Sequence, residues 1–172
     1  MKIGLAGQGA FGIKHLEAVA NIPGIEVITL TGGNQESTAE VAKKFNIPHY
    51  TGDIGESLKQ PGLEAMLLAT PTQMHAAQAI QTMRAGKHVM IEIPMADSLE
   101  DSEKIVKVAK ETGMIAMAGH TRRFNPSHQW IHKKIVAGEL KLLQLNVQTY
   151  FFRRTNMNAL GKPRSWTDHL LW

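Results

Sequence analysis

Three glycines near the start of the chain constrain its fold more than any other feature. Gly7, Gly9 and Gly12 form the sequence Gly-Gln-Gly-Ala-Phe-Gly, between the apolar run 3–6 and an apolar helical stretch over 11–20. A strand, a tight glycine turn and a helix in this order are typical of a dinucleotide-binding βαβ unit. Gly7 permits the turn, Gly9 lets the backbone approach a pyrophosphate, and Gly12 lets the helix pack against the strand.

The start of the helix after this turn is suited to an anion. Its first backbone N–H groups, those of Ala10 and Phe11 among them, lie at the positive end of the helix dipole. A pyrophosphate over Gly9 would meet these groups directly. We therefore predict a dinucleotide site here, and the alternative is a glycine turn that serves packing alone.

Apolar runs alternate with helical patterns along the first two thirds of the chain. We predict strands over 26–31, 65–69, 88–93 and 115–118, and helices over 37–45, 72–85 and 98–112. Strands that alternate with helices pair in parallel, and continuous apolar runs fit strands buried on both faces. The predicted fold class is α/β, with a doubly wound parallel Rossmann sheet over residues 1–121.

The pattern changes after residue 121. Asn125 and Pro126 begin a predicted helix that carries Trp130 as a core residue, and residues 142–152 alternate as in a half-buried strand. A long amphipathic strand without a sheet is a poor end for a domain. We therefore expect residues 122–172 to begin an incomplete α+β substrate domain of a longer protein. The alternative is a short protein whose last strand pairs across a dimer.

Composition excludes several classes of function. The 172 residues include no cysteine, which excludes disulfides, thiolate catalysis and a cysteine-based zinc site. No metal site is predicted. The formal charge of +4 comes from scattered basic residues without a nucleic-acid-binding motif, and no stretch is long and apolar enough for a membrane span. Lys2 is followed at once by the first strand, so we expect no signal peptide and a cytoplasmic protein.

Four motifs together resemble the Gfo/Idh/MocA oxidoreductase family. They are the glycine fingerprint, Ala69-Thr70-Pro71-Thr72 with His75, Glu92-Ile93-Pro94, and the segment 119–126. The later segments 148–161 and 164–172 resemble a branch of that family that oxidises a ring-cleavage semialdehyde in protocatechuate degradation. The resemblance implies a nicotinamide-dependent dehydrogenase with a longer chain, and we expect a homo-oligomer.

The resemblance also assigns residues to the cofactor. Glu92 is expected near the nicotinamide ribose, with Pro71 and His75 shaping the same pocket, although Glu92 and Pro94 by themselves could merely end a strand. His75 by itself is more typical of a helix surface. The full set of predicted cofactor residues is Gly7, Gly9, Ala10, Phe11, Gly12, Thr31, Asn34, Thr70, Pro71, Thr72, His75, Glu92 and Pro94.

Proton transfer must differ from the usual family pattern. Most members carry a proton-transferring lysine where this chain has Ile93, which cannot move a proton, and the semialdehyde-oxidising branch shares that isoleucine. There a cyclic hemiacetal loses hydride to the nicotinamide while a base removes the hydroxyl proton. Within this chain the predicted bases are Asp168 and His169, although a better base is expected just beyond Trp172.

The implied substrate is a small polycarboxylate, which an arginine can hold by two parallel hydrogen bonds. Arg122 and Arg164 are the preferred candidates, with His120 and His128 as further donors, and the alternative for each arginine is a surface charge.

The choice of cofactor depends on the end of the second strand. Residues 30–34 read Leu-Thr-Gly-Gly-Asn, with neither the carboxylate that holds the NAD ribose nor a basic residue typical of NADP sites. Because a missing carboxylate removes repulsion of a 2′-phosphate, we predict NADP, with NAD possible. The predicted function is an NADP-dependent dehydrogenase of a hemiacetal or semialdehyde in aromatic degradation. Two alternatives are a family member that acts on a sugar or polyol, and a dinucleotide-binding fragment without turnover.

Overall fold

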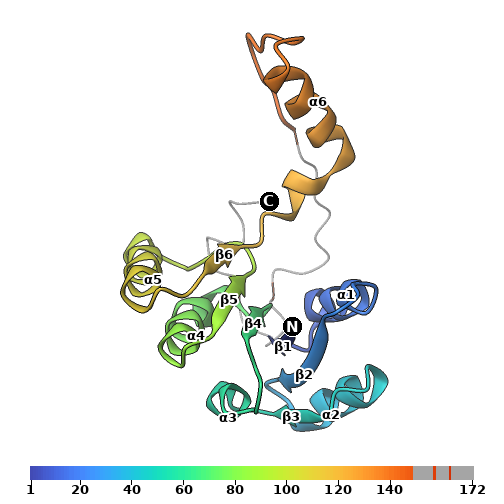
Figure 1. Cartoon of the computed structure of the whole chain (residues 1–172), viewed down its shortest axis with the longest axis vertical. Helices are drawn as coiled ribbons and strands as arrows, with labels where there is room; N and C mark the ends of the chain where they lie inside the picture. Colours follow the sequence, from blue (N-terminus) through green and yellow to red (C-terminus); the bar gives the residue numbers. More distant parts are fainter. Residues whose placement is uncertain (149–156, 158–162, 164–172) are drawn as a thin grey trace.

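A parallel sheet of six strands forms the centre of the molecule (Figure 1). The computed structural model describes residues 1–148, 157 and 163. The strands, in the order β3-β2-β1-β4-β5-β6, are β1 (Lys2–Ala6), β2 (Glu26–Thr31), β3 (His49–Thr51), β4 (Ala65–Leu68), β5 (His88–Ile91) and β6 (Ala116–Ala118). Every neighbouring pair is parallel. This order confirms the predicted doubly wound Rossmann fold.

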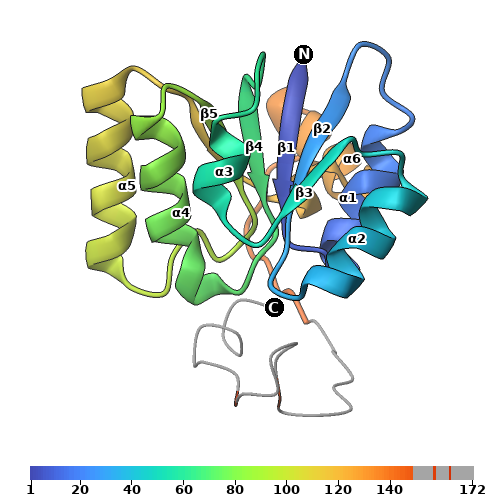
Figure 2. The ribbon, with the colours of Figure 1, turned by 90° about the horizontal axis from the view of Figure 1, so that it is seen from below.

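Helices cover both faces of the sheet (Figure 2). They are α1 (Ala10–Val19), α2 (Gln35–Lys44), α3 (Ile54–Leu58), α4 (Thr72–Arg84) and α5 (Leu99–Thr112), followed by the short 3-10 helix η1 (Thr121–Phe124) and α6 (Pro126–Val136). Figure 2 has α1 and α2 on one side of the sheet and α3, α4 and α5 on the other. The right-handed crossovers of parallel strands place successive helices in these two layers.

Each layer of helices has its own hydrophobic core. On the α1 and α2 side, Leu16 packs with Leu5 and Leu30 of the sheet. On the other side, Met83 of α4 and Ile105 of α5 belong to a larger cluster around β4 and β5. Each of these five side chains is at most 2% exposed, and burying one contributes about 1.5–3 kcal/mol. The apolar strands are therefore buried on both faces, as predicted.

Local signals in the sequence set the ends of the long helices. The Oγ atom of Ser98 accepts a hydrogen bond from the backbone N–H of Asp101 (3.1 Å), which caps the start of α5. Gly113 ends α5 in the left-handed conformation, at a φ of 69°. Both ends confirm the predicted helix over 98–112.

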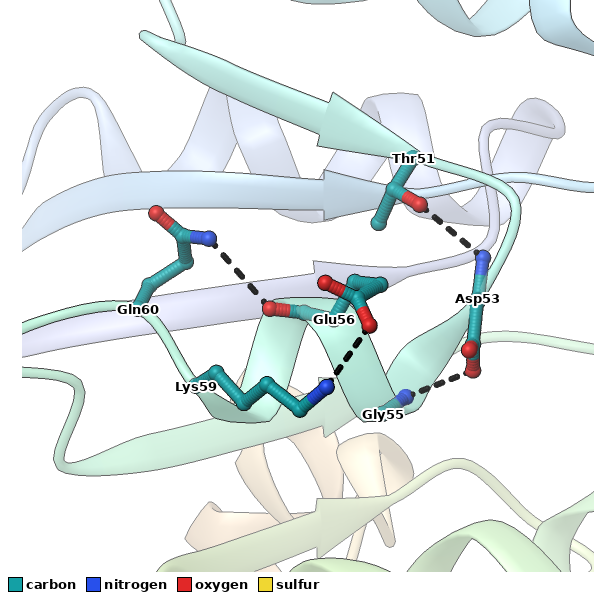
Figure 3. Close-up of polar contacts among 6 residues, drawn as sticks. All are labelled: Thr51, Asp53, Gly55, Glu56, Lys59 and Gln60. Atoms are coloured by element: carbon teal, nitrogen blue, oxygen red, sulfur yellow. Dashed lines mark hydrogen bonds and ion pairs between the residues drawn. The ribbon is translucent and has the colours of Figure 1, made fainter.

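The sequence patterns missed β3 and α3, which have three and five residues. The Oδ1 atom of Asp53 accepts a hydrogen bond from the N–H of Gly55 (2.8 Å), and the Asp53 N–H donates to the Oγ1 atom of Thr51 (3.1 Å) (Figure 3). The hydrogen bond and ion pair with Glu56 (2.8 Å) raise the pKa of Lys59. Capping, not hydrophobic periodicity, defines α3.

The segment after β6 leaves the sheet, and in Figure 1 α6 stands apart from it. No residue of α6 is buried, and Trp130, predicted as a core residue, is 61% exposed. The predicted strand over 142–152 is not observed in its described part, 142–148, where Leu143 is 86% exposed. The predicted strand is therefore wrong for residues 142–148, because an alternating segment forms a strand only against a partner, and the described part of the chain offers none. Among the described residues, no helix is long and apolar enough to cross a bilayer.

Candidate functional site

The carboxyl ends of the strands meet at one edge of the sheet and are joined there by backbone hydrogen bonds. The Gly7 N–H donates to the carbonyl of Thr31 (2.8 Å), which links the turns after β1 and β2. The Ala69 N–H donates to Ala6 (2.8 Å), and the Glu92 N–H donates to Leu68 (2.9 Å). The chain winds in opposite directions on either side of the β1 and β4 pair, and ligands of open α/β sheets bind at such a switch point.

The glycine turn has the close contacts that the fingerprint requires. Gly7 has a φ of +113°, and a Cβ there would overlap the carbonyl of Ala69. A Cβ on Gly12 would overlap the carbonyl of Gly7, so this glycine lets α1 pack against the turn. The predicted roles of Gly7 and Gly12 are therefore consistent with the structure.

Gly9 differs from these two glycines because it faces open space. Apart from Gly9 itself and its two chain neighbours, no heavy atom of the described residues lies within 4 Å of the position that a Cβ on Gly9 would take. Gly9 is the N-cap of α1, no described side chain caps this helix, and its first turn, which includes Ala10 and Phe11, contains no acidic residue. A pyrophosphate fits this surface, because backbone N–H groups and a positive dipole end can bind it.

The turn after β2 contains two of the predicted cofactor residues. The Oγ1 atom of Thr31 lies 2.7 Å from the buried Oγ atom of Ser57, so this side chain lies against α3. Asn34 is the N-cap of α2, and its Oδ1 atom accepts a hydrogen bond from the N–H of Ser37 (2.9 Å). Asn34 therefore has a structural function at the position where a cofactor contact is predicted.

His75 connects the turn after β4 with the segment after β5. Its imidazole is 1% exposed, with Nε2 2.8 Å from the carbonyl of Thr70 and Nδ1 2.8 Å from the carbonyl of Pro94. The neutral ring can donate to one carbonyl, and the protonated ring can donate to both. Pro71 is the N-cap of α4 and Thr72 is its first residue. The structure therefore brings five predicted residues together, which are Thr70, Pro71, Thr72, His75 and Pro94.

Glu92 has a partner that the sequence analysis missed. The Nε2 atom of His15, in α1, lies 2.6 Å from the Oε1 atom of Glu92, and both side chains are largely buried. The Ile93 N–H donates to the second carboxylate oxygen (3.2 Å). Gly12 and Leu16 are the buried residues of α1, and His15 lies three residues after the first and next to the second. Helical periodicity could therefore have indicated that the His15 side chain faces the interior.

The predicted substrate residues of the described chain follow β6, whose end is joined to β5 by a hydrogen bond from the Gly119 N–H to the Ile91 carbonyl (2.7 Å). His120, Arg122 and His128 are exposed, in η1 or beside it and in α6, and the Nδ1 atom of His128 lies 3.0 Å from the Arg122 carbonyl. Arg164, Asp168 and His169 lie outside the described residues. The described part of the chain contains no cluster of three or more His, Cys, Asp or Glu residues suited to a metal ion.

Known proteins resemble this chain in both sequence and fold. It is 59% identical over all 172 residues to the 4-carboxy-2-hydroxymuconate-6-semialdehyde dehydrogenase of Sphingobium sp. (strain NBRC 103272 / SYK-6), of which it spans 55%. It is 32% identical over 138 residues, or 80% of its length, to the scyllo-inositol 2-dehydrogenase (NAD(+)) of Bacillus subtilis (strain 168), of which the match covers 40%. The crystal structure of a probable dehydrogenase from Thermotoga maritima has the same fold, with a TM-score of 0.78 at 24% identity, over 80% of this chain and 41% of that one.

Family descriptions match nearly the whole sequence. Residues 1–120 match the Gfo/Idh/MocA description "Oxidoreductase family, NAD-binding Rossmann fold", and residues 126–172 match "Bacterial oxidoreductases, C-terminal". The first match covers the whole sheet and the turns that carry Gly7, His75 and Glu92. The chain belongs to the Gfo/Idh/MocA family of NAD(P)-binding oxidoreductases.

Proposed function

We propose that the full-length protein is an NADP-dependent dehydrogenase that oxidises the cyclic hemiacetal of a ring-cleavage semialdehyde in aromatic degradation. The observation that carries the proposal is the 59% identity, over the whole chain, to a relative named for a muconate semialdehyde. The resemblance implies that this branch shares Ile93, at the position where most of the family is expected to carry a proton-transferring lysine. Because the chain spans 55% of that relative, the activity is proposed for the longer protein.

The reaction removes a hydride and a proton from the hemiacetal. When bound, the nicotinamide supplies the hydride acceptor. Glu92, held by His15, would position the nicotinamide ribose, and the His75 contacts would fix the turns on either side of it. The hydride leaves the hemiacetal carbon and the proton leaves its hydroxyl, so a lactone carbonyl forms. Ile93 would contribute an apolar wall and no proton transfer.

The proposed base and the substrate residues come from residues 120–172. Asp168 or His169, outside the described residues, would accept the hydroxyl proton. The substrate carboxylates would be bound by guanidinium and imidazole donors, which are His120, Arg122, His128 and Arg164. A small anionic substrate suits these donors. We further propose a homo-oligomer, and the cytoplasm as its compartment, because a chain without cysteine suits reducing conditions.

NADP is the proposed cofactor. Residues 31–34 carry no acidic side chain that would repel a 2′-phosphate, and a Cβ on Gly33 would have no described atom within 4 Å. A 2′-phosphate could therefore approach the backbone of this turn closely. NAD remains the second candidate, since the family description names an NAD-binding fold and one relative is named for NAD(+).

A polyol dehydrogenase is the second candidate function, favoured by the 32% identity to the scyllo-inositol enzyme. The test uses the full-length protein and follows absorbance at the nicotinamide band, with NADP and NAD, against the carboxy-hydroxymuconate semialdehyde and against scyllo-inositol. The proposal expects turnover of the semialdehyde, faster with NADP. Turnover of the inositol alone would overturn it, and binding of a dinucleotide without any turnover would favour a cofactor-binding module.

A further inference from the structure

We infer that the side chain of Gln8, between the first two glycines of the turn, determines which adenosine ribose this protein accepts. The inference rests on the proposed dinucleotide site. In Rossmann proteins the residue at the end of the second strand usually makes this choice. In this chain the structure points to a residue of the first turn instead.

The Gln8 carboxamide lies against the turn between β2 and α2. Its Oε1 atom accepts a hydrogen bond from the N–H of Gly33, and its Nε2 atom donates to the Oγ atom of Ser37, each at 3.3 Å. A Cβ on Gly32 would stand 2.6 Å from the same Oε1 atom, so the carboxamide and the turn are closely packed. Gln8 is thus held at the carboxyl end of β2, where the adenosine ribose is expected.

The other residues of this turn have few side-chain groups that could form a hydrogen bond with a ribose. Gly32 and Gly33 have no side chains, and the Oδ1 atom of Asn34 caps α2. The hydroxyl of Thr38 donates to the carbonyl of Asn34 and is buried. The half-buried hydroxyl of Ser37 already donates to the carbonyl of Asn34 (3.3 Å) and accepts from Gln8. Gln8 therefore provides a partly exposed polar group of this region that is not engaged in a helix cap.

A carboxamide at this place would favour binding of NADP and would still allow binding of NAD. The group has two N–H donors, and among the described contacts one of them serves Ser37. Both hydrogen bonds of Gln8 are long, so a ligand oxygen can replace them at small cost. A neutral amide donates to a 2′-phosphate without repelling it and can equally bind a 2′-hydroxyl. A carboxylate at the same place would repel the phosphate and accept the ribose hydroxyls.

The test measures dissociation constants of NADPH and NADH by calorimetry on the full-length protein. Gln8→Glu should weaken NADPH by about tenfold to a hundredfold, the range of a hydrogen bond to a charged group, and leave NADH within about threefold. Gln35→Glu is the matched control, since it adds the same charge on the exposed first residue of α2, and among the described hydrogen bonds Gly33 is joined to Gln8 and not to Gln35. It should change the affinity ratio far less.

Ser37→Ala gives an independent reading, because it removes the hydroxyl that holds the carboxamide and introduces no charge. It should lower the preference for NADPH by about threefold to tenfold. The inference is overturned if Gln8→Glu binds both cofactors with the wild-type ratio, or if Gln35→Glu has an equal effect. If Gln8→Glu does not fold, an unchanged ratio in Ser37→Ala overturns it. Failure of the wild-type protein to bind either dinucleotide would instead contradict the proposed function.

Discussion

The imidazole of His15, in the helix after the glycine turn, is paired with the carboxylate of Glu92 at the end of β5, with 2.6 Å between Nε2 and Oε1. The two residues are 77 positions apart, and their side chains are only 16% and 10% exposed. A carboxylate this far from water needs a donor, and His15 supplies it. The pair ties the proposed pyrophosphate end of the site to its proposed nicotinamide end.

Replacing the imidazole should therefore destabilise the protein. His15→Leu leaves the Glu92 carboxylate buried with one donor fewer, and should lower the free energy of unfolding by about 1–3 kcal/mol. Urea denaturation measures this change. His15→Gln retains an N–H donor and should recover most of the loss. An equal loss in both variants would mean that packing, and not the donated hydrogen bond, makes His15 important.

Gly9, whose Cβ position is open, and Gly12, whose Cβ position is blocked, should respond differently to substitution. Gly9→Val should abolish dinucleotide binding while the free energy of unfolding changes by less than about 1 kcal/mol, because no described atom lies within 4 Å of the added Cβ. Gly12→Ala should instead lower the free energy of unfolding by about 1–3 kcal/mol or more, since the added Cβ would overlap the Gly7 carbonyl. Calorimetric titration and denaturation measure the two effects. Unchanged affinity in folded Gly9→Val would remove the nucleotide site from this turn.

A basic residue at the end of β2 should strengthen the preference for NADP. Gly33→Arg is the suitable substitution, because this residue has no positive φ and its Cβ would enter open space. A guanidinium there should raise the ratio of NADP to NAD affinity by about tenfold. A flat ratio of the two dissociation constants would mean that this turn does not face the ribose.

Asn34→Arg serves as the comparison for that variant. It offers the same guanidinium one residue later but removes the hydrogen bond that caps α2. The free energy of unfolding should fall by about 1 kcal/mol. Any gain in NADP affinity should therefore come with a lower melting temperature, which Gly33→Arg should not show.

Ile93→Lys separates the two proposed substrate classes. Ile93 is half-buried beside the paired Glu92, so a lysine there would place a flexible charged side chain where the proposal has an apolar wall. We expect hemiacetal turnover by the full-length variant to fall by roughly tenfold or more, an added barrier of about 1.4 kcal/mol. Steady-state rates on the semialdehyde and on scyllo-inositol measure the outcome. A gain of inositol activity with hemiacetal activity intact would contradict the assignment to the semialdehyde-oxidising branch.

The sequence by itself determined the doubly wound sheet, because its signals are local. Apolar runs of strand length, Ser98 and Gly113 at the ends of α5, and the strand, turn and helix around Gly7, Gly9 and Gly12 each act within a few residues. Helix caps and the backbone freedom of glycine act within a few residues, although the close contact of Gly7 with the Ala69 carbonyl depends on the fold. The same reasoning missed β3 and α3, whose few residues show no periodicity, and predicted a strand over 142–152 where the described residues show none.

Only the tertiary structure decided which polar groups of the site meet. His15 with Glu92, Gln8 with Ser37, and His75 between the carbonyls of Thr70 and Pro94 join turns that follow different strands. Parallel pairing brings the carboxyl ends of these strands to one edge of the sheet, and burial then requires each polar group to find a partner. Asn34 shows the same dependence, since a residue predicted to contact a cofactor also caps a helix in the structure. Side-chain partners across a sheet follow from strand order and packing, which no short stretch of sequence encodes.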